Sequence, residues 1–243
     1  MKLNPKLDAQ ELSARFKRDS RISIAHILRD EDARALRKAI EQEPHRNMVF
    51  YANGRHFDID GAGWRALGVE KKRTTEQIIN AEAQKGFSYH YENLPIYDRW
   101  RQKSAMGSLL CEAVEFLNSE DFLSLMRRVT GFDDIAFADA QATLYGPGHF
   151  LTLHDDAVEG KNRRAAYVLN LTGDWSNDWG GYLNFFDSEG NIEAAYKPAF
   201  NALNVFSVPA AHSVGYVAPF AGALRCSITG WLRAGKDVDV GAS

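Results

Sequence analysis

The chain has 243 residues, 45% of them hydrophobic, so it can form one large domain or two small ones around a buried core. Its net charge is −3 and its basic residues are spread out, apart from a small cluster at Lys161, Arg163 and Arg164 that we expect in a solvated loop, which argues against direct nucleic-acid binding. The two cysteines fit neither a zinc site nor a disulfide framework, and no apolar run reaches the ~18 residues of a membrane helix, so we expect a cytoplasmic protein.

The N-terminal part opens with helical and extended patterns. Apolar residues recur at helical spacing over residues 7–18 and 30–43, and Asp30 is the expected cap of the second helix. Residues 22–28 alternate between these helices and predict a strand. Over residues 45–69, glycines and aromatic residues follow no period, so we expect a long loop on the substrate side.

Helical periodicity returns in the middle of the chain. Three further helices are predicted, over residues 74–85, 104–117 and 119–129. Ser119 is the expected cap of the last one, and Gly131 ends it. Residues 87–92 alternate aromatic and polar side chains, which predicts a strand.

After residue 131 the pattern changes to short alternating strands with turn residues between them. We expect strands at residues 135–145, 150–156, 165–171, 181–187, 193–196, 203–208, 213–217 and 224–232. Eight short strands at this spacing predict an antiparallel sandwich or jelly roll, with the N-terminal helices packed on one sheet. The expected organisation is a single α+β domain, with helical support and substrate-side loops in residues 1–131, a β core in 132–233 and a tail at 234–243.

A histidine and a carboxylate two residues apart on a strand share one face and can bind the same metal ion. The chain has three such pairs, His56-Phe57-Asp58, His90-Tyr91-Glu92 and His154-Asp155-Asp156, where chance predicts roughly one. The first lies beside a turn signal, and the second has the alternation of an ordinary half-exposed strand. The third continues a regular strand pattern that follows a Gly-Pro-Gly turn, and it is the pair we select.

Two later features support this selection. His212 stands at the start of a predicted strand and can supply a second imidazole. Two histidines and one carboxylate form the facial triad of non-haem Fe(II) oxygenases, which leaves coordination positions open for an α-keto acid and O₂. Arg225 shares a strand face with Ser227 and Thr229, and its planar guanidinium suits the far carboxylate of a keto acid.

At these residues the chain resembles the 2-oxoglutarate and Fe(II)-dependent oxygenases, which implies a double-stranded β-helix core. The resemblance rests on His154-x-Asp156, His212 and Arg225-x-Ser227. Further motifs, Arg163-Arg164, Trp175, Gly180-Gly181 and 225–231, are similar to the catalytic domain of eukaryotic ribosomal-protein prolyl hydroxylases. The match spans roughly residues 22–233, and we expect a single-domain, bacterial-type member of the prolyl-hydroxylase branch.

The sequence departs from these relatives at two places. A two-residue insertion is expected near Lys161-Asn162, and Asn170 stands where relatives often have tyrosine. Both differences are expected near the pocket that binds the co-substrate, so they bear on its finer contacts.

The resemblance implies a role for each matching residue. His154, Asp156 and His212 would bind Fe(II). Arg225 and Tyr145 would bind 2-oxoglutarate, and other residues expected to line that pocket are Ser227, Tyr167, Asn170 and Thr229. O₂ is the second co-substrate, and ascorbate is a reductant that such enzymes use.

The implied reaction is hydroxylation of an unactivated C–H bond, with a prolyl residue in a protein as the expected substrate. Aromatic residues expected to contact that substrate are Tyr51, Trp64, Tyr89 and Tyr91. Two alternatives stay open at this point. One is a hydroxylase of a free amino acid or small metabolite, and the other is a non-catalytic jelly roll that binds a carbohydrate or a small acid.

Overall fold

The computed structural model describes residues 1–236, so most of the predicted tail lies outside the described residues. The helices are α1 (Ala9–Asp19), α2 (Asp30–Gln42), α3 (Gly61–Ala66), α4 (Val69–Ala83), α5 (Ile96–Arg101), α6 (Ser108–Leu117) and α7 (Glu120–Thr130), with a 3-10 turn η1 (Asn177–Trp179). The strands are β1 (Arg21–Ala25), β2 (Asn47–Ala52), β3 (Arg55–Asp60), β4 (Tyr89–Leu94), β5 (Ile135–Ala138), β6 (Gln141–Tyr145), β7 (Phe150–His154), β8 (Arg163–Asn170), β9 (Leu183–Phe186), β10 (Ile192–Tyr196), β11 (Ala202–Ser207), β12 (His212–Val214) and β13 (Arg225–Ala234).

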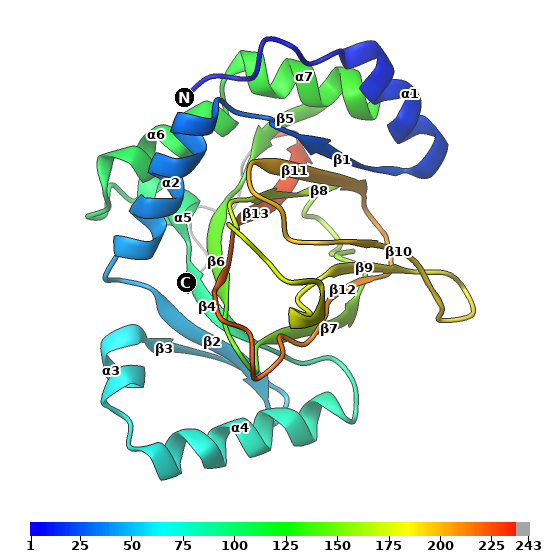
Figure 1. The fold of residues 1–243 in the computed structure, drawn as a ribbon. Coiled ribbons are helices and arrows are strands. Elements are labelled where there is room, and N and C mark those ends of the chain that lie inside the picture. The colour runs from blue at the N-terminus through cyan, green and yellow to red at the C-terminus, as the bar shows by residue number, and fades with distance from the viewer. Residues whose placement is uncertain (237–243) are drawn as a thin grey trace.

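The strands pair antiparallel in a single 13-stranded sheet that curls into a nearly closed barrel (Figure 1). The order along its main path is β1-β11-β8-β13-β6-β4-β7-β12-β9-β10. β13 lies between β8 and β6, whereas β7 and β12 pair in another part of the same curled sheet. The α+β jelly-roll fold that the sequence predicts is therefore confirmed.

Five helices, α1, α2, α5, α6 and α7, lie together on one side of the barrel, whereas α3 and α4 lie beside the β2–β3 hairpin (Figure 1). α1 lies beside α7, and α2 packs against α6 (Figure 1). Their apolar faces join residues of the barrel strands in the main core, including Leu12, Phe16, Leu36, Ile40, Val114, Phe122, Met126, Leu169, Val205 and Ile228. The helices thus hold the β13 side of the barrel rigid by burying its outer face.

The helix ends confirm one predicted cap and correct another. The Ser119 hydroxyl accepts the backbone N–H of Phe122, and Gly131 ends α7 with a φ of 74°. Asp30 is not a cap, because Arg29 occupies that position and Asp30 is the first residue of α2. The Asp30 carboxylate instead accepts a hydrogen bond from the amide of Asn201 at 2.8 Å.

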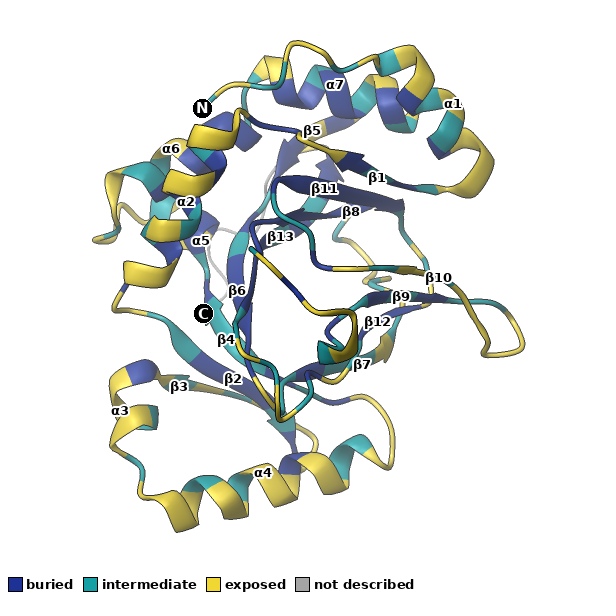
Figure 2. Ribbon diagram, viewed as in Figure 1, coloured by how far each residue is buried: buried dark blue, intermediate teal, exposed yellow. Residues whose placement is uncertain are grey.

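The predicted long loop at residues 45–69 is wrong. It contains the β2–β3 hairpin, followed by α3 and the first residue of α4. The hairpin turn is Asn53-Gly54, with φ of 52° and 72°, which is the pairing that a tight two-residue turn requires. The Asp60 carboxylate then caps α3 by accepting two backbone N–H groups. Of the α4 residues only Ile79 is buried, and most of that helix faces solvent (Figure 2).

Two other predicted elements differ from the structure. The strand expected over residues 135–145 is divided into β5 and β6 at Asp139, whose carboxylate accepts the Trp231 backbone N–H at 2.7 Å. The strand expected to reach residue 156 ends at His154, because Asp156 has a left-handed backbone with φ of 63°. That change of direction matters for the site described next.

Candidate metal and co-substrate site

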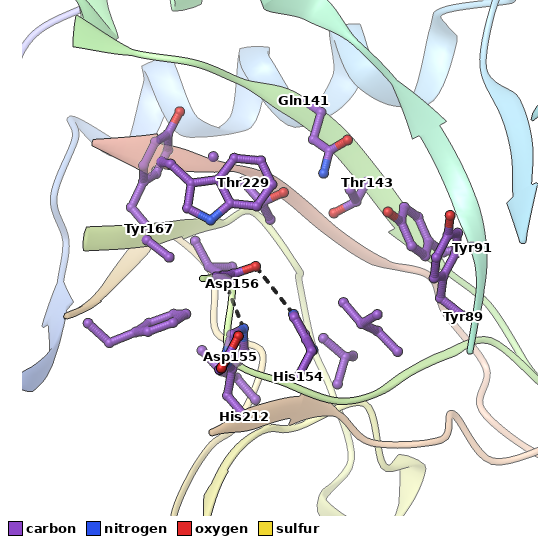
Figure 3. Close-up of a pocket in the computed structure, with 18 of the residues that line it drawn as sticks. Tyr89, Tyr91, Gln141, Thr143, His154, Asp155, Asp156, Tyr167, His212 and Thr229 are labelled. Carbon is purple, nitrogen blue, oxygen red and sulfur yellow. Dashed lines mark ion pairs between the residues drawn. The ribbon is translucent and has the colours of Figure 1, made fainter. Parts of the chain in front are cut away.

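Three polar side chains converge inside the barrel at the β7–β12 pair. His154 ends β7, His212 begins β12, and the two residues are direct partners in the strand register. The Asp156 carboxylate reaches both imidazoles, with its oxygens 3.5 Å from His154 Nε2 and 3.4 Å from His212 Nε2 (Figure 3). Ligand atoms of all three residues lie within 4.8 Å of one another, which is close enough to hold one metal ion.

Hydrogen bonds to the backbone fix the orientation of both histidines. His154 Nδ1 lies 2.9 Å from the Thr152 carbonyl oxygen, and His212 Nδ1 lies 2.7 Å from that of Ala210. Since a carbonyl only accepts, each Nδ1 donates its proton and each Nε2 turns a lone pair toward the centre of the group. Both imidazoles are therefore oriented as metal ligands require.

The electrostatics of the group favour the same protonation states. Burial, together with the charge of His212, lowers the pKa of His154 and keeps its imidazole neutral at pH 7. Burial opposes the charge on Asp156, but its hydrogen bond with His212 and the nearby imidazoles outweigh this and lower the pKa of the carboxyl. A neutral imidazole at His154 and a carboxylate at Asp156 are the forms in which these groups bind Fe(II) in a facial triad.

The other two histidine–carboxylate pairs have different partners. His56 lies on β3 of the hairpin, and its Nδ1 is 2.6 Å from the hydroxyl of Tyr89 on β4. His90 packs against aromatic rings, and Glu92 pairs with Arg46 at 2.8 Å. Within residues 1–236, only the third pair joins a further histidine in a group that could hold a metal ion.

Arg225 is a buried cation inside the barrel. Its side chain is 1% exposed, and it has no ion pair with any residue from 1 to 236. Nη1 lies 3.4 Å from the Ser227 hydroxyl, Nε has no hydrogen-bond partner among these residues, and the Tyr145 ring centre lies 4.9 Å from the guanidinium carbon. Burial lowers the pKa of Arg225. A buried guanidinium without a counter-ion is costly, so this position suits an anionic ligand.

One cavity of about 460 Å³ is lined both by the histidine group and by Arg225. Figure 3 shows the histidine group among other residues of the cavity wall. Of the residues that the sequence points to, it is lined by Tyr89, Tyr91, Tyr145, His154, Asp156, Tyr167, His212, Arg225 and Thr229. The Tyr145 ring stacks on Tyr91 at 4.9 Å, and burial raises the pKa of Tyr145, so its hydroxyl stays a proton donor. The Tyr167 hydroxyl donates instead to the Asp139 carbonyl oxygen at 2.7 Å.

Four expected residues do not line this cavity. Ser227 and Asn170 lie behind its wall, where Ser227 bonds Thr143 at 3.0 Å and the Asn170 amide faces backbone carbonyls. Trp64 packs with Phe50 and His90 in a separate apolar cluster under α4, because the hairpin turns that face of β2 away from the barrel. Tyr51 lies further out on the hairpin and contacts Phe87 and Tyr89.

The cavity wall also includes Phe87, Arg163 and Trp231, to which the sequence interpretation gives no role. Arg163 is not in a solvated loop, because it begins β8 and its guanidinium stacks on the Trp231 ring. Trp231 follows Arg225, Ser227 and Thr229 in the same period-two pattern, and this signal could have identified it.

The expected insertion at Lys161-Asn162 lies away from Arg225. The carbonyl of Lys161 accepts the Arg233 Nε–H at 2.8 Å, and that of Asn162 accepts the Ala234 N–H at 2.9 Å. Arg233 and Ala234 end β13, whereas Arg225 begins it. The insertion therefore does not touch the pocket around Arg225, contrary to expectation.

Comparison with known proteins agrees with this geometry. Residues 140–233, which contain the histidine group and Arg225, match the family model described as 2OG-Fe(II) oxygenase superfamily. Over these residues the chain is similar to members of this superfamily. Members use Fe(II) with 2-oxoglutarate, and the donor set and the unpaired buried cation fit these two groups.

Curated relatives of this chain include the prolyl 3-hydroxylase OGFOD1 of Mus musculus, 32% identical over 127 residues, which are 49% of this chain and 23% of that protein. The prolyl 3-hydroxylase OGFOD1 of Xenopus laevis is 31% identical over 129 residues, covering 50% and 25%. The match thus spans about a quarter of the length of these curated relatives.

Solved structures share the fold of this chain. A prolyl-4-hydroxylase from Pseudomonas putida superposes with a TM-score of 0.57 at 20% identity, over 94% of this chain and all of the other. A prolyl hydroxylase from Trichoplax adhaerens, solved with a hypoxia inducible factor peptide fragment, gives 0.58 at 18% identity over 93% and 89%. Among residues 1–236, no helix has the length and apolar character needed to cross a membrane.

Proposed function

We propose that this protein is a 2-oxoglutarate- and Fe(II)-dependent oxygenase that hydroxylates a prolyl residue in a protein or peptide. The observation that carries the proposal is one cavity whose wall holds both the His154–Asp156–His212 group and the unpaired cation Arg225. The curated relatives are prolyl hydroxylases, which supports prolyl as the substrate class.

The roles proposed for individual residues follow from their contacts. His154 and His212 bind Fe(II) through the Nε2 atoms that their backbone hydrogen bonds leave free, and Asp156 adds one carboxylate oxygen. With 2-oxoglutarate and O₂, the iron supplies the oxidising chemistry that replaces a substrate C–H with C–OH, while 2-oxoglutarate leaves as succinate and CO₂.

The co-substrate is proposed to bind at the buried side of the cavity. Arg225 pairs with the far carboxylate of 2-oxoglutarate and so gains the counter-ion that it lacks. Tyr145 lies against the Arg225 guanidinium and donates its hydroxyl to the same carboxylate. Ser227 orients Arg225 from behind the wall, and Asn170 contributes only through packing there.

An aromatic wall is proposed to receive the substrate. Phe87 is 45% exposed, and its ring centre lies 5.9 Å from that of His154. Tyr89 joins Phe87 to Tyr91 deeper in the cavity, and Tyr51 continues the aromatic surface onto the hairpin. A proline ring in an extended segment packs well on such surfaces. Trp64 packs under α4, so we do not include it among the residues that contact the substrate.

The alternative of a free amino acid has an observation in its favour. Asp155 and Arg163 also line the cavity, and they are charged groups of the kind that an ammonium and a carboxylate would need. The test must therefore compare peptides with the free compound. Ascorbate as reductant, a cytoplasmic location and a single-domain organisation are part of the proposal.

The direct test incubates the protein with Fe(II), 2-oxoglutarate, ascorbate and air, together with either proline-containing peptides or free L-proline. We expect succinate formation that depends on peptide, and a peptide mass increased by one oxygen atom on a prolyl residue. Oxidation of L-proline alone would favour the small-molecule alternative. No succinate above the substrate-free level with any proline compound would contradict the prolyl proposal.

A further inference from the structure

The backbone of Asp156 has an unusual conformation. Its φ of 63° is in the left-handed region, which residues other than glycine enter at a cost in free energy. This conformation ends β7 after His154 and turns the Asp156 side chain toward both imidazoles. If the backbone relaxed to an extended conformation, the carboxylate would leave the group. A further contact must therefore hold the Asp156 backbone in its left-handed conformation.

Arg163 supplies such a restraint. Its Nη1 donates a hydrogen bond to the Asp156 carbonyl oxygen at 2.8 Å. Arg163 is the first residue of β8, and it is the register partner of Arg233 on β13. The hydrogen bond therefore ties the turn after β7 to the β8–β13 pair.

The Arg163 guanidinium is itself fixed in place. Its central carbon lies 3.5 Å from the centre of the Trp231 ring, which is close enough for planar stacking. Trp231 is on β13, the strand that begins with Arg225. Arg163 thus links the backbone of Asp156 to the strand that carries the proposed co-substrate anchor.

We propose that Arg163 is a positioning residue for the metal site, which acts by holding the left-handed backbone of Asp156 and is kept in place by Trp231. The inference rests on the proposed function of the His154–Asp156–His212 group. Lysine cannot replace Arg163 fully. Its ammonium group has no planar face to stack on the Trp231 ring, and it lacks the rigid set of N–H donors that fixes the orientation of a guanidinium.

The test uses metal affinity and does not depend on turnover. Arg163→Met and Arg163→Lys are titrated anaerobically with Fe(II) alone and with Co(II) alone, and the Co(II) visible spectrum reports the geometry of the site. Arg164→Met is the matched control, since Arg164 is the neighbouring arginine, pairs with Asp134 on the surface and is 41% exposed. Thermal unfolding of each metal-free variant shows whether it is folded.

We expect Arg163→Met to bind both metals about tenfold more weakly or worse, with an altered Co(II) spectrum, and Arg163→Lys to fall in between. Arg164→Met should bind like the wild type. Trp231→Leu should also weaken binding, but Trp231 interacts with the Asp156 carboxyl as well as with Arg163, so Arg163→Lys is the variant that keeps the test open if Arg163→Met fails to fold. A folded Arg163→Met with wild-type affinity and spectrum would overturn the inference, whereas a wild type that binds neither metal would overturn the proposed function itself.

Discussion

His154 and His212 face each other across the β7–β12 pair, with their ring centres 4.0 Å apart. Because side chains alternate along a strand, a register slip of one residue would turn one of the two imidazoles away from the other. The metal site therefore depends on strand pairing as much as on residue identity. The register shift between His212 and Val214 follows directly after the histidine, so it leaves the pairing at His212 intact.

Removing one imidazole should abolish stabilisation by metal. Fe(II) or Co(II) at about 100 times its dissociation constant should raise the unfolding free energy of the wild type by about 2.7 kcal/mol. His212→Ala should lose most of this increase, because only His154 and Asp156 remain. His26→Ala, which removes a surface histidine paired with Asp30, should keep it. Thermal unfolding with and without metal measures the effect, and equal increases in all three proteins would contradict the assignment.

Replacing Arg225 should weaken 2-oxoglutarate binding without lowering the stability of the ligand-free protein. Arg225→Met should raise the 2-oxoglutarate dissociation constant at least about thirtyfold, because the far carboxylate loses its charge partner. Without 2-oxoglutarate the same variant should be as stable as the wild type or up to about 2 kcal/mol more stable, because an unpaired buried charge has been removed. Urea unfolding of both proteins, with and without 2-oxoglutarate, measures both quantities. A variant strongly destabilised without ligand would show that Arg225 is already compensated.

The buried His90 should make the fold sensitive to acid. Burial, with the charge of His149, lowers the pKa of His90 from 6.5 to about 3. A lowered histidine pKa favours the neutral form in the folded state, so its stabilisation is present above pH 6.5 and is lost as the pH falls toward 3. Between pH 6.5 and 4 the wild type should lose roughly 3 kcal/mol more than His90→Phe. Urea unfolding at several pH values tests this, and parallel pH curves would show that His90 does not cause the loss.

Phe87 should contribute to substrate binding and little to stability. It is 45% exposed beside the histidine group, so Phe87→Ala should change the unfolding free energy by less than about 0.5 kcal/mol. Loss of its apolar contact should raise KM for a proline peptide about fivefold to thirtyfold. Phe220→Ala is the control, since Phe220 is 68% exposed and does not line the cavity. Steady-state kinetics with both variants measure this KM. An equal change in KM for Phe87→Ala and Phe220→Ala would show that Phe87 does not contact the substrate.

The sequence predicted those parts of the site that lie on single strands. Arg225 heads a strand with a polar face, so period-two reasoning found it. The same reasoning selected His154 and Asp156, although β7 ends at His154 and the left-handed backbone of Asp156 brings its carboxylate to the imidazoles. The convergence of His212 with them depends on cross-strand register, which one sequence does not display. His212 was selected because it starts a predicted strand and completes a facial triad, and the resemblance to the oxygenases supported that choice.

Other features escaped the sequence analysis for physical reasons. The hairpin turn Asn53-Gly54 carries a recognisable signal, but β2 is buried along most of its length and lacks alternation. The withdrawal of Trp64 from the cavity depends on which face of β2 meets α4. The hydrogen bond between Arg163 and the Asp156 carbonyl depends on the folded structure and leaves no pattern in the sequence. The next residue, Arg164, does lie on the surface, so the sequence Arg163-Arg164 looks like part of a charged loop.

The most direct test of the central claim is an anaerobic titration of the protein with Fe(II) and then 2-oxoglutarate, followed by visible absorbance. We expect a weak charge-transfer band from iron to the bound keto acid in the wild type. It should be absent in His154→Ala, and Arg225→Met should need far more 2-oxoglutarate to produce it. Absence of the band from wild-type protein shown to be loaded with iron would mean that the site does not chelate a keto acid. The jelly roll would then be a binding protein and not an oxygenase.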